Sequence, residues 1–311
     1  MTVRLAVTLG DPRGIGPEIT NRALHEPLDA EIVLVGAEDQ IAGIPAAERV
    51  SVGSWGLGSG DRVDHSRTLR AGRIAGHAIE TAAKLAMSGA VDAIVTAPAN
   101  KSALHLAGFP WPGHTEWLAH LAGDVPVAMM LASERLRVIL VTTHVPLRDV
   151  PSLLTTERVV STGQIAIAGL RDWFGVAVPR LAVCALNPHA GEGGAFGDED
   201  DRILAPAARQ LGAAGPLPAD TVFVRALRGE FDAVLAPYHD VGMTAIKVAS
   251  FGEAVNVTLG LPFPRTSPDH GTAFDIAGTG RADPSSMRRA LEMAVKLGQR
   301  PTVNGQPSTV D

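Results

Sequence analysis

The sequence predicts an α/β fold in which the strands of a largely parallel sheet alternate with helices. Three apolar, partly β-branched runs have the composition of buried strands, and each ends at a histidine: RVILVTTH at His144, RLAVCALNPH at His189 and AVLAPYH at His239. Hydrophobic residues make up 46% of the chain and charged residues 19%, which is typical of a globular protein. A length of 311 residues exceeds what one compact core usually serves, so we expect two domains.

The first elements follow from local signals. Residues 3–9 form a short strand pattern, and Pro17 and Glu18 favour a helix start, because proline lacks the N–H that has no partner there and glutamate complements the helix dipole. His114 and Thr115 stand before a helix expected near Glu116, where an imidazole, a hydroxyl and free amides can hold an anion; alternatively, Thr115 is simply the N-cap. The other elements expected in this half are strands at 31–36 and 92–96, a helix at 68–87 and a short helix from Asn100.

The second half begins with two apolar runs, 127–131 and 137–141, that read as a hairpin and predict a mixed sheet. The glycine-rich segment 187–197 is expected to be a loop that approaches a ligand closely. Residues 239 and 240 are expected in a turn, and Asp220 at the end of an extended turn. The remaining expected elements are helices at 153–174, 198–212 and 284–297, strands at 180–186 and 254–259, a rigid proline-containing loop around Arg265 and a disordered tail at 298–311.

The three strand-end histidines suggest a metal site. In an open parallel α/β sheet, ligands collect at the carboxyl ends of the strands, because the loops there face one crevice. His144, His189 and His239 can therefore meet around one divalent ion. The alternative is that each histidine is an ordinary loop residue, and separations of tens of residues do not decide between the two.

Composition excludes several classes of protein. A net charge of −6 argues against general nucleic-acid binding. The only cysteine, Cys184, can form no disulfide within the chain and lies in an apolar run, so we expect a buried thiol in a reducing compartment. The N-terminus has too short an apolar core for a signal peptide, and no run reaches the roughly 18 apolar residues of a membrane span, so a cytoplasmic protein is expected.

A set of segments in one order resembles the 4-hydroxythreonine-4-phosphate dehydrogenase family of pyridoxal phosphate biosynthesis. The segments are GDPRGIGPE, VTAPANK, GHTE, TTHVPLRD, LNPHAGEGG, GPLPAD, YHDVG and NVTLGLPFPRTSPDHGTA. The resemblance implies two α/β/α domains with a cleft between them, as in isocitrate and isopropylmalate dehydrogenases, in a homodimer whose active site is shared across the interface. The domains implied are residues 1–112 with 272–311, and residues 113–271, the second carrying most metal and substrate residues.

The resemblance also implies a reaction: oxidation by NAD or NADP of the secondary alcohol of a 4-phosphorylated hydroxy acid, followed by decarboxylation of the 3-keto acid. One divalent ion (Zn, Co, Ni, Mn or Mg) would be held by His144, His189 and His239. The substrate-binding residues implied are His114, Thr115, Lys247, Asn256 and Arg265. Asp220, Asp240 and Lys247 are the catalytic candidates; either aspartate can take the proton or orient a ligand histidine, and the sequence does not choose between them.

Departures from the family pattern bear on the substrate. Ala97 stands where glycine is common, Asn100 where histidine is common, and Val241 where glutamine is common, while Thr244 and Ala245 replace an apolar residue and a proline. These changes favour a relative that oxidises threonate or erythronate 4-phosphate; an aromatic cis-dihydrodiol carboxylate is an alternative. Two further hypotheses are a zinc hydrolase with a three-histidine site and a non-catalytic binder of phosphorylated metabolites.

Overall fold

The protein divides into two compact units. A computed structural model describes residues 2–56, 65–250 and 253–299. Unit 1 comprises Met1–Val125 with Leu261–Asp311, and unit 2 comprises Pro126–Gly260. By this division His114, Thr115 and Arg265 belong to unit 1, whereas Lys247, Asn256 and the three strand-end histidines belong to unit 2.

Unit 1 is built on a parallel sheet in the order β3-β2-β1-β4-β11. Its core strands β1 and β4 are mostly apolar and almost entirely buried, as expected for strands covered on both faces. The strands are β1 (Val3–Thr8), β2 (Ala30–Gly36), β3 (Glu48–Ser51), β4 (Ala93–Thr96) and β11 (Arg265–Ser267).

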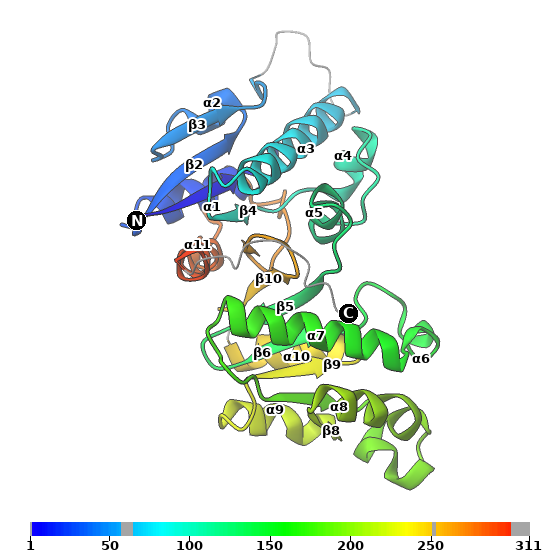
Figure 1. Cartoon of the computed structure of the whole chain (residues 1–311). Helices are drawn as coiled ribbons and strands as arrows, with labels where there is room; N and C mark the ends of the chain where they lie inside the picture. Colours follow the sequence, from blue (N-terminus) through cyan, green and yellow to red (C-terminus); the bar gives the residue numbers. More distant parts are fainter. Residues whose placement is uncertain (1, 57–64, 251–252, 300–311) are drawn as a thin grey trace. The chain divides into compact units, whose positions relative to one another are not determined.

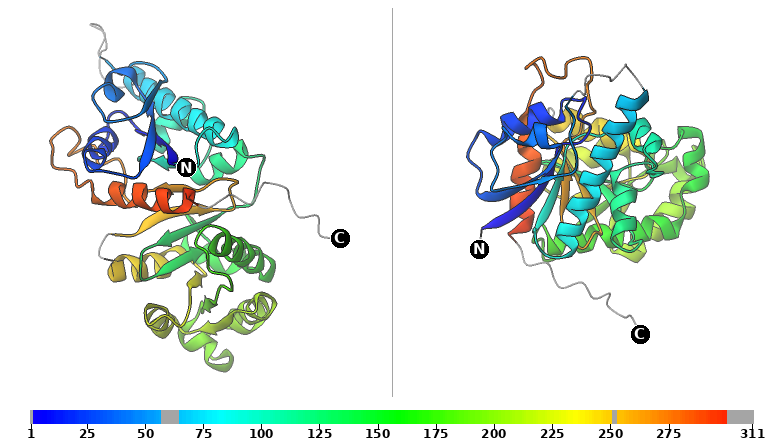
Figure 2. Two further views of the ribbon diagram at one scale, coloured as in Figure 1. Left: turned by 60° about the vertical axis from the view of Figure 1, so that its left-hand side comes forward. Right: turned by 90° about the horizontal axis from the view of Figure 1, so that it is seen from above.

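Helices cover both faces of this sheet (Figures 1 and 2). The long helix α3 (His65–Met87) packs on one face, and α1 (Gly16–Leu24) and α11 (Ser285–Gly298) pack on the other. Pro17 lies in the first turn of α1, as its missing N–H predicts. The shorter helices are α2 (Glu38–Ile41), α4 (Lys101–Leu106) and α5 (His114–Leu121).

Unit 2 contains a mixed sheet in the order β10-β5-β6-β9-β7-β8. The predicted hairpin is confirmed: β5 pairs antiparallel with β6, and β10 pairs antiparallel with β5. The pairs β6·β9, β9·β7 and β7·β8 are parallel. The strands are β5 (Ala128–Ala132), β6 (Arg137–Leu140), β7 (Leu181–Cys184), β8 (Ala214–Leu217), β9 (Ala233–Ala236) and β10 (Val255–Leu259).

The helices of unit 2 also lie on two faces (Figures 1 and 2). Helices α7 (Thr156–Asp172) and α8 (Ala205–Leu211) cover one face, and α9 (Ala219–Leu227) and α10 (His239–Ser250) cover the other. Gly242 lets α10 approach the sheet, because a Cβ there would come within 2.7 Å of Leu140 Cδ2. The remaining elements are short: α6 (Val150–Leu153), η1 (Leu147–Asp149), η2 (Pro188–Gly194) and η3 (Asp200–Leu204).

Several local expectations were wrong. Arg265, expected in a loop, begins the strand β11. Residues 239 and 240 do not form a turn but begin α10, and Asp220 lies in the first turn of α9 instead of ending an extended turn. Thr115 is not the N-cap of α5, because that position belongs to Gly113. The expected tail falls almost entirely on residues 300–311, outside the described residues.

The structure also bears on the burial of Cys184 and on whether any described helix could cross a membrane. Cys184 is buried in the core of unit 2, as expected of a structural thiol. Across residues 2–56, 65–250 and 253–299, none of the helices combines the length and the apolarity that crossing a membrane requires.

Candidate active site

A buried arginine is the centre of a candidate site in unit 1. Arg265 begins β11 and is only 3% exposed. Its Nε and Nη2 both donate to Thr96 Oγ1, at 3.1 and 2.6 Å, from the end of the adjacent strand β4. Burial lowers the pKa of Arg265 to about 10, while the charge of Glu116 acts in the opposite direction. The guanidinium therefore remains charged at neutral pH in a place where charge is costly, which suits a site that receives an anion.

His114 lies within the electrostatic reach of this arginine. The residue as a whole is partly exposed, but its Nε2 is buried and has no hydrogen-bond partner among the described residues. Burial first, and then the positive charges of Arg265 and Lys101, lower the pKa of His114 to about 3. The imidazole is therefore neutral at physiological pH and can give or accept one hydrogen bond at Nε2, depending on its tautomer.

Backbone amides complete this anion site. Helix α5 starts at His114, and its N-cap Gly113 offers no side chain to the first-turn N–H groups. Thr115, in that turn, is 9% exposed. A neutral imidazole, a hydroxyl, free amides and a guanidinium in one small region match the oxygens of a phosphate or carboxylate.

A pair of histidines forms a separate candidate site in unit 2. Strands β6 and β9 run parallel, and their pairing continues past the strand ends through Val141 N to Ala236 O (2.9 Å) and Thr142 Oγ1 to Pro237 O (2.7 Å). His144 and His239 follow two residues later on each chain segment, and their ring centroids lie 5.7 Å apart. A small pocket at this place is lined by Thr143, His144, Val145, Leu147, Val150, Tyr238, His239 and Asp240.

The spacing of this pair fits two ligands of one metal ion. An imidazole nitrogen lies about 2.0–2.1 Å from a bound Zn²⁺, so two rings on one ion have centroids roughly 5–6 Å apart. His239 Nδ1 lies 2.7 Å from Asp240 Oδ1. A carboxylate at one ring nitrogen orients the ring and leaves Nε2 for a metal, as is usual for metal-ligating histidines.

His189 lies on the loop after β7, the strand next to β9. The buried carboxylate of Asp200 accepts N–H groups from Leu186 (2.8 Å) and Asn187 (3.0 Å) and so fixes the start of this loop. His189 has φ 54° and a side chain that is 66% exposed, and its Nδ1 lies 3.7 Å from Glu192 Oε2. Within the described ranges, no three His, Cys, Asp or Glu side chains are grouped so as to hold a metal ion, so His189 does not join the pair in this chain.

The other candidate residues of unit 2 differ in burial. Asp220 and Lys247 are exposed, on α9 and α10. Asp240 is also exposed, and its Oδ1 contacts His239 Nδ1. Asn256 lies on β10, and its Oδ1 is buried with no hydrogen-bond partner among the described residues. A buried amide oxygen of this kind is suited to a ligand's donor.

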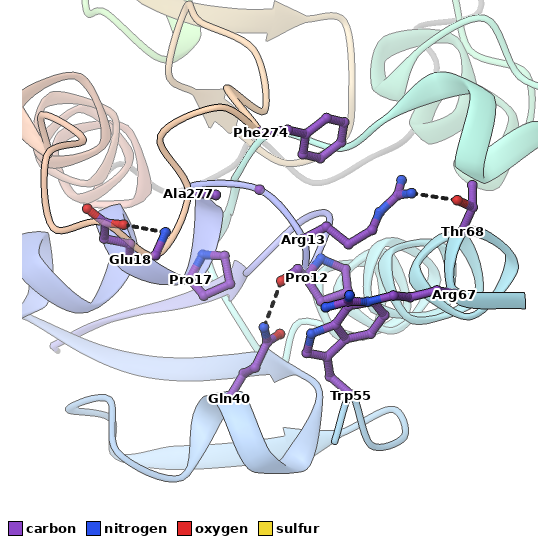
Figure 3. A pocket seen from close by; sticks show the side chains of 12 residues that line it. Pro12, Arg13, Pro17, Glu18, Gln40, Trp55, Arg67, Thr68, Phe274 and Ala277 are labelled. Atoms are coloured by element: carbon purple, nitrogen blue, oxygen red, sulfur yellow. Dashed lines mark hydrogen bonds between the residues drawn. The ribbon is translucent and has the colours of Figure 1, made fainter. Parts of the chain in front are cut away.

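One pocket of unit 1 was not expected from the sequence. It has a volume of about 540 Å³. Arg13 lies over the Phe274 ring at 5.0 Å and is bound by Asp11, while Arg67 lies over Trp55 at 5.1 Å (Figure 3). The pocket is lined by Pro12, Arg13, Gly14, Pro17, Glu18, Gln40, Trp55, Arg67, Thr68, Phe274, Ala277 and Gly278. Aromatic faces beside guanidinium groups can hold the base and phosphates of a nucleotide.

Several of these residues gave no signal in the sequence. Thr96 looked like any threonine that ends a strand, and Lys101 like the start of a helix. Trp55 stands in a glycine- and serine-rich stretch, where an isolated tryptophan is a usable hint of a binding surface.

Taken separately, the two units indicate a class of protein. Unit 2 has a histidine pair with a carboxylate at one ring nitrogen, which suits a divalent metal ion, and unit 1 has a buried cation beside a neutral histidine, which suits an anion. Both features are typical of a metal-dependent enzyme that acts on an anionic substrate.

Comparison with known proteins gives the family. The profile of the family described as "Pyridoxal phosphate biosynthetic protein PdxA" matches residues 37–294. The chain belongs to this family. It is an NAD(P)-dependent dehydrogenase, and dehydrogenases of this kind use a nicotinamide cofactor together with a divalent metal ion.

Relatives match the chain over nearly its whole length. It is 46% identical to a 4-hydroxythreonine-4-phosphate dehydrogenase of Geobacter metallireducens, over 95% of this chain and 96% of the relative. It is 43% identical to a D-threonate 4-phosphate dehydrogenase of Salmonella typhimurium, over 95% of this chain and 99% of the relative. The family resemblance deduced from the sequence is thereby confirmed.

Solved structures confirm the fold. A 4-hydroxythreonine-4-phosphate dehydrogenase from Klebsiella pneumoniae superposes with a TM-score of 0.86 at 40% identity, covering 96% of this chain and 99% of the other. A terephthalate 1,2-cis-dihydrodiol dehydrogenase from Burkholderia xenovorans is more distant, with a TM-score of 0.67 and 28% identity over 94% and 98%. The expected dehydrogenase fold of the isocitrate and isopropylmalate type is confirmed.

Proposed function

We propose that this enzyme oxidises the secondary alcohol of a 4-phosphorylated hydroxy acid, either 4-hydroxythreonine 4-phosphate or a threonate or erythronate 4-phosphate. The observation that carries the proposal is the anion site of unit 1, where the buried cation Arg265 acts on the neutral imidazole of His114, whose Nε2 is buried. Relatives at 43% and 46% identity are named for phosphorylated substrates, whereas the dihydrodiol relative is only 28% identical.

In this proposal Arg265, His114 and Thr115 bind the phosphate, and Lys247 and Asn256 also contact the substrate. The imidazoles of His144, His189 and His239 hold the divalent ion, and Asp240 keeps the ring of His239 oriented through Nδ1. When bound, the ion supplies a Lewis acid at the alcohol oxygen, and NAD or NADP accepts the hydride. Asp220 and Lys247 are the remaining candidates for moving the proton. Imidazole ligands favour Zn, Co, Ni or Mn over Mg.

The nucleotide of the cofactor is proposed to occupy the pocket of unit 1. Its volume of about 540 Å³ falls in the range of cofactor sites. Trp55 and Phe274 offer aromatic faces, and Gln40 Oε1 is buried with no hydrogen-bond partner among the described residues, so it can accept a hydrogen bond from a ligand. A cytoplasmic location is also proposed, which the single, buried Cys184 supports.

A homodimer is proposed to complete the metal site. Leu147 and Phe196 are 64% and 52% exposed and lie close in sequence to His144 and His189, and exposed large apolar side chains of this kind favour an interface. Because, within the described part of the chain, His144 and His239 form a pair without a third ligand, His189 of the partner subunit is proposed to supply the third imidazole.

Two experiments test these proposals. Four-carbon phosphorylated hydroxy acids, offered with NAD and NADP, should form reduced cofactor and release CO₂, and a chelator should abolish both; turnover without nicotinamide would instead favour the hydrolase hypothesis. Mixing inactive His189→Ala and His239→Ala protomers should restore part of the activity, because each heterodimer then regains one intact site. No restoration by mixed dimers would contradict a shared metal site.

A further inference from the structure

We propose that Thr96 is a positioning residue for the anionic group of the substrate, acting through Arg265. The inference rests on the proposed function, because it gives Arg265 the task of binding that anion. Thr96 is 1% exposed, and its hydroxyl receives both Nε–H (3.1 Å) and Nη2–H (2.6 Å) of the guanidinium.

These two hydrogen bonds constrain the guanidinium strongly. They come from two nitrogens of one planar group and converge on one oxygen, so they set both its position and the rotation of its plane. An arginine side chain that is otherwise free to rotate loses rotamer entropy when it binds an anion. Because Thr96 already restricts the Arg265 side chain in the folded protein, part of this entropy loss occurs on folding and not on substrate binding.

The backbone that carries Thr96 is itself fixed. Thr96 is the last residue of β4 and pairs with Thr8 of β1. The next residue continues the pairing, because Ala97 N donates to Thr8 O at 3.0 Å. Threonine is β-branched, so its χ1 is restricted and the hydroxyl keeps one direction. A rigid strand, a restricted rotamer and two converging hydrogen bonds form a support suited to a precise anion contact.

Thr8 provides an internal comparison. It is the cross-strand partner of Thr96 and is also fully buried, yet its Oγ1 has no hydrogen-bond partner among the described residues. Thr8 and Thr96 are therefore two buried threonines at paired positions on adjacent strands. Thr96 accepts hydrogen bonds from Arg265, whereas the Thr8 hydroxyl does not. Replacing each by valine removes the same atom from the same kind of place.

The test compares Thr96→Val with Thr96→Ser and Thr8→Val in the full-length enzyme. Losing hydrogen bonds to a charged group should raise KM for the phosphorylated acid roughly 10- to 100-fold in Thr96→Val, with a smaller change in kcat and none in KM for the cofactor. Thr96→Ser keeps the acceptor and should stay within a few-fold of wild type, and Thr8→Val should match wild type. Binding of inorganic phosphate, followed by calorimetry, should weaken in the same order.

A combined variant separates this role from a structural one. If Thr96 acts through Arg265, then adding Thr96→Val to Arg265→Gln should cause no further loss of phosphate binding, so the two effects are not additive. A purely structural Thr96 would lower the unfolding temperature of Thr96→Val while leaving KM and phosphate binding unchanged, and that result would overturn the proposal. Should Thr96→Val not fold, Thr96→Cys, a weaker acceptor of similar size, carries the same prediction at reduced magnitude.

The controls also separate this inference from the proposed function. If Arg265→Gln alone leaves KM for the acid and phosphate binding unchanged, then the assigned anion site is wrong and the role of Thr96 falls with it. If Arg265→Gln raises KM for the acid and weakens phosphate binding, while Thr96→Val changes neither quantity, then only the inference about Thr96 is wrong.

Discussion

His144 and His239 lie at the ends of two adjacent parallel strands with their ring centroids 5.7 Å apart. The register of β6 and β9 causes this approach, since Leu140 pairs with Ala236 and the backbone pairing extends to Thr142 and Pro237. The pair is therefore fixed by the sheet itself. Two ligands of the proposed metal site are therefore positioned by neighbouring strands.

The first prediction concerns metal content. His239→Ala and His144→Ala should each lose the bound divalent ion and lower kcat by more than about 100-fold, because each removes a direct ligand of the proposed site. Metal per protomer, measured by mass spectrometry of the purified protein, checks this directly. His25→Asn, at an exposed position on α1's C-terminal side, is the matched control and should retain both metal and activity. Full metal content in His239→Ala would remove that residue from the ligand set.

The two aspartates can be told apart by metal affinity. Asp240 contacts His239 Nδ1 at 2.7 Å, so Asp240→Asn should weaken metal binding about 10- to 100-fold, as expected for an orienting carboxylate. Asp220 is exposed on α9, and Asp220→Asn should leave metal affinity unchanged. Competition with a chromophoric chelator measures the metal affinity of each variant. Equal metal affinities in the two variants would show that Asp240 does not orient His239.

The sequence revealed which strands end in histidines but not which strands are neighbours. Apolar runs before His144, His189 and His239 were visible, and all three are strands. That β6 lies beside β9, nearly a hundred residues away, depends on tertiary pairing that no local pattern encodes. The helix starting at His239 was missed because Tyr238-His239-Asp240 has turn-like composition, whereas packing of Gly242 and Ile246 against the sheet favours a helix.

The anion site shows the same limit. The position of His114 and Thr115 before an expected helix already suggested an anion site, but Arg265 was assigned to it only from the family resemblance, because nothing local distinguishes Arg265 from an exposed arginine. The neutral state of His114 arises from burial and from charges brought by other elements, which become visible only in the folded chain. Thr96 likewise gave no signal in the sequence, because its contact with Arg265 forms only in the folded chain.

The protonation of His114 should affect stability at acidic pH. Its pKa is lowered from 6.5 in the unfolded chain to about 3 in the fold. Between these values the unfolded state binds a proton that the folded state does not, so the free energy of unfolding falls as pH falls. Urea unfolding of wild type should weaken from about pH 6.5 to about pH 4.5 more steeply than that of His114→Asn, by up to about 1.4 kcal/mol per pH unit.

The control for this experiment is His120→Asn, on an exposed position of the same helix. It removes a histidine but leaves His114 in place, so its pH dependence should follow that of wild type. Parallel curves for wild type and His114→Asn would show that His114 is not held neutral by the fold.

Cys184 should be chemically inert in the folded enzyme. Burial, with a contribution from the charge of Asp200, raises the pKa of its thiol to about 12, so almost no thiolate forms near neutral pH. A chromogenic thiol reagent at about pH 8 should react with no thiol in the native protein and with one thiol per chain in denaturant. Rapid reaction of the native protein would show that the core around β7 opens readily.

The pocket of unit 1 can be tested through its aromatic faces. Trp55 lies under Arg67 at 5.1 Å, and a base stacked on such a ring contributes roughly 1–3 kcal/mol. Trp55→Ala should therefore raise KM for NAD or NADP about 5- to 150-fold and leave KM for the phosphorylated acid nearly unchanged. The matched control is Phe231→Ala in unit 2, which removes a ring from a similar pair with Arg225 at 5.0 Å, away from this pocket, and should change neither constant. Steady-state kinetics with each substrate varied in turn measures both constants, and a rise in the KM of the acid instead of the cofactor would assign the pocket to the other ligand.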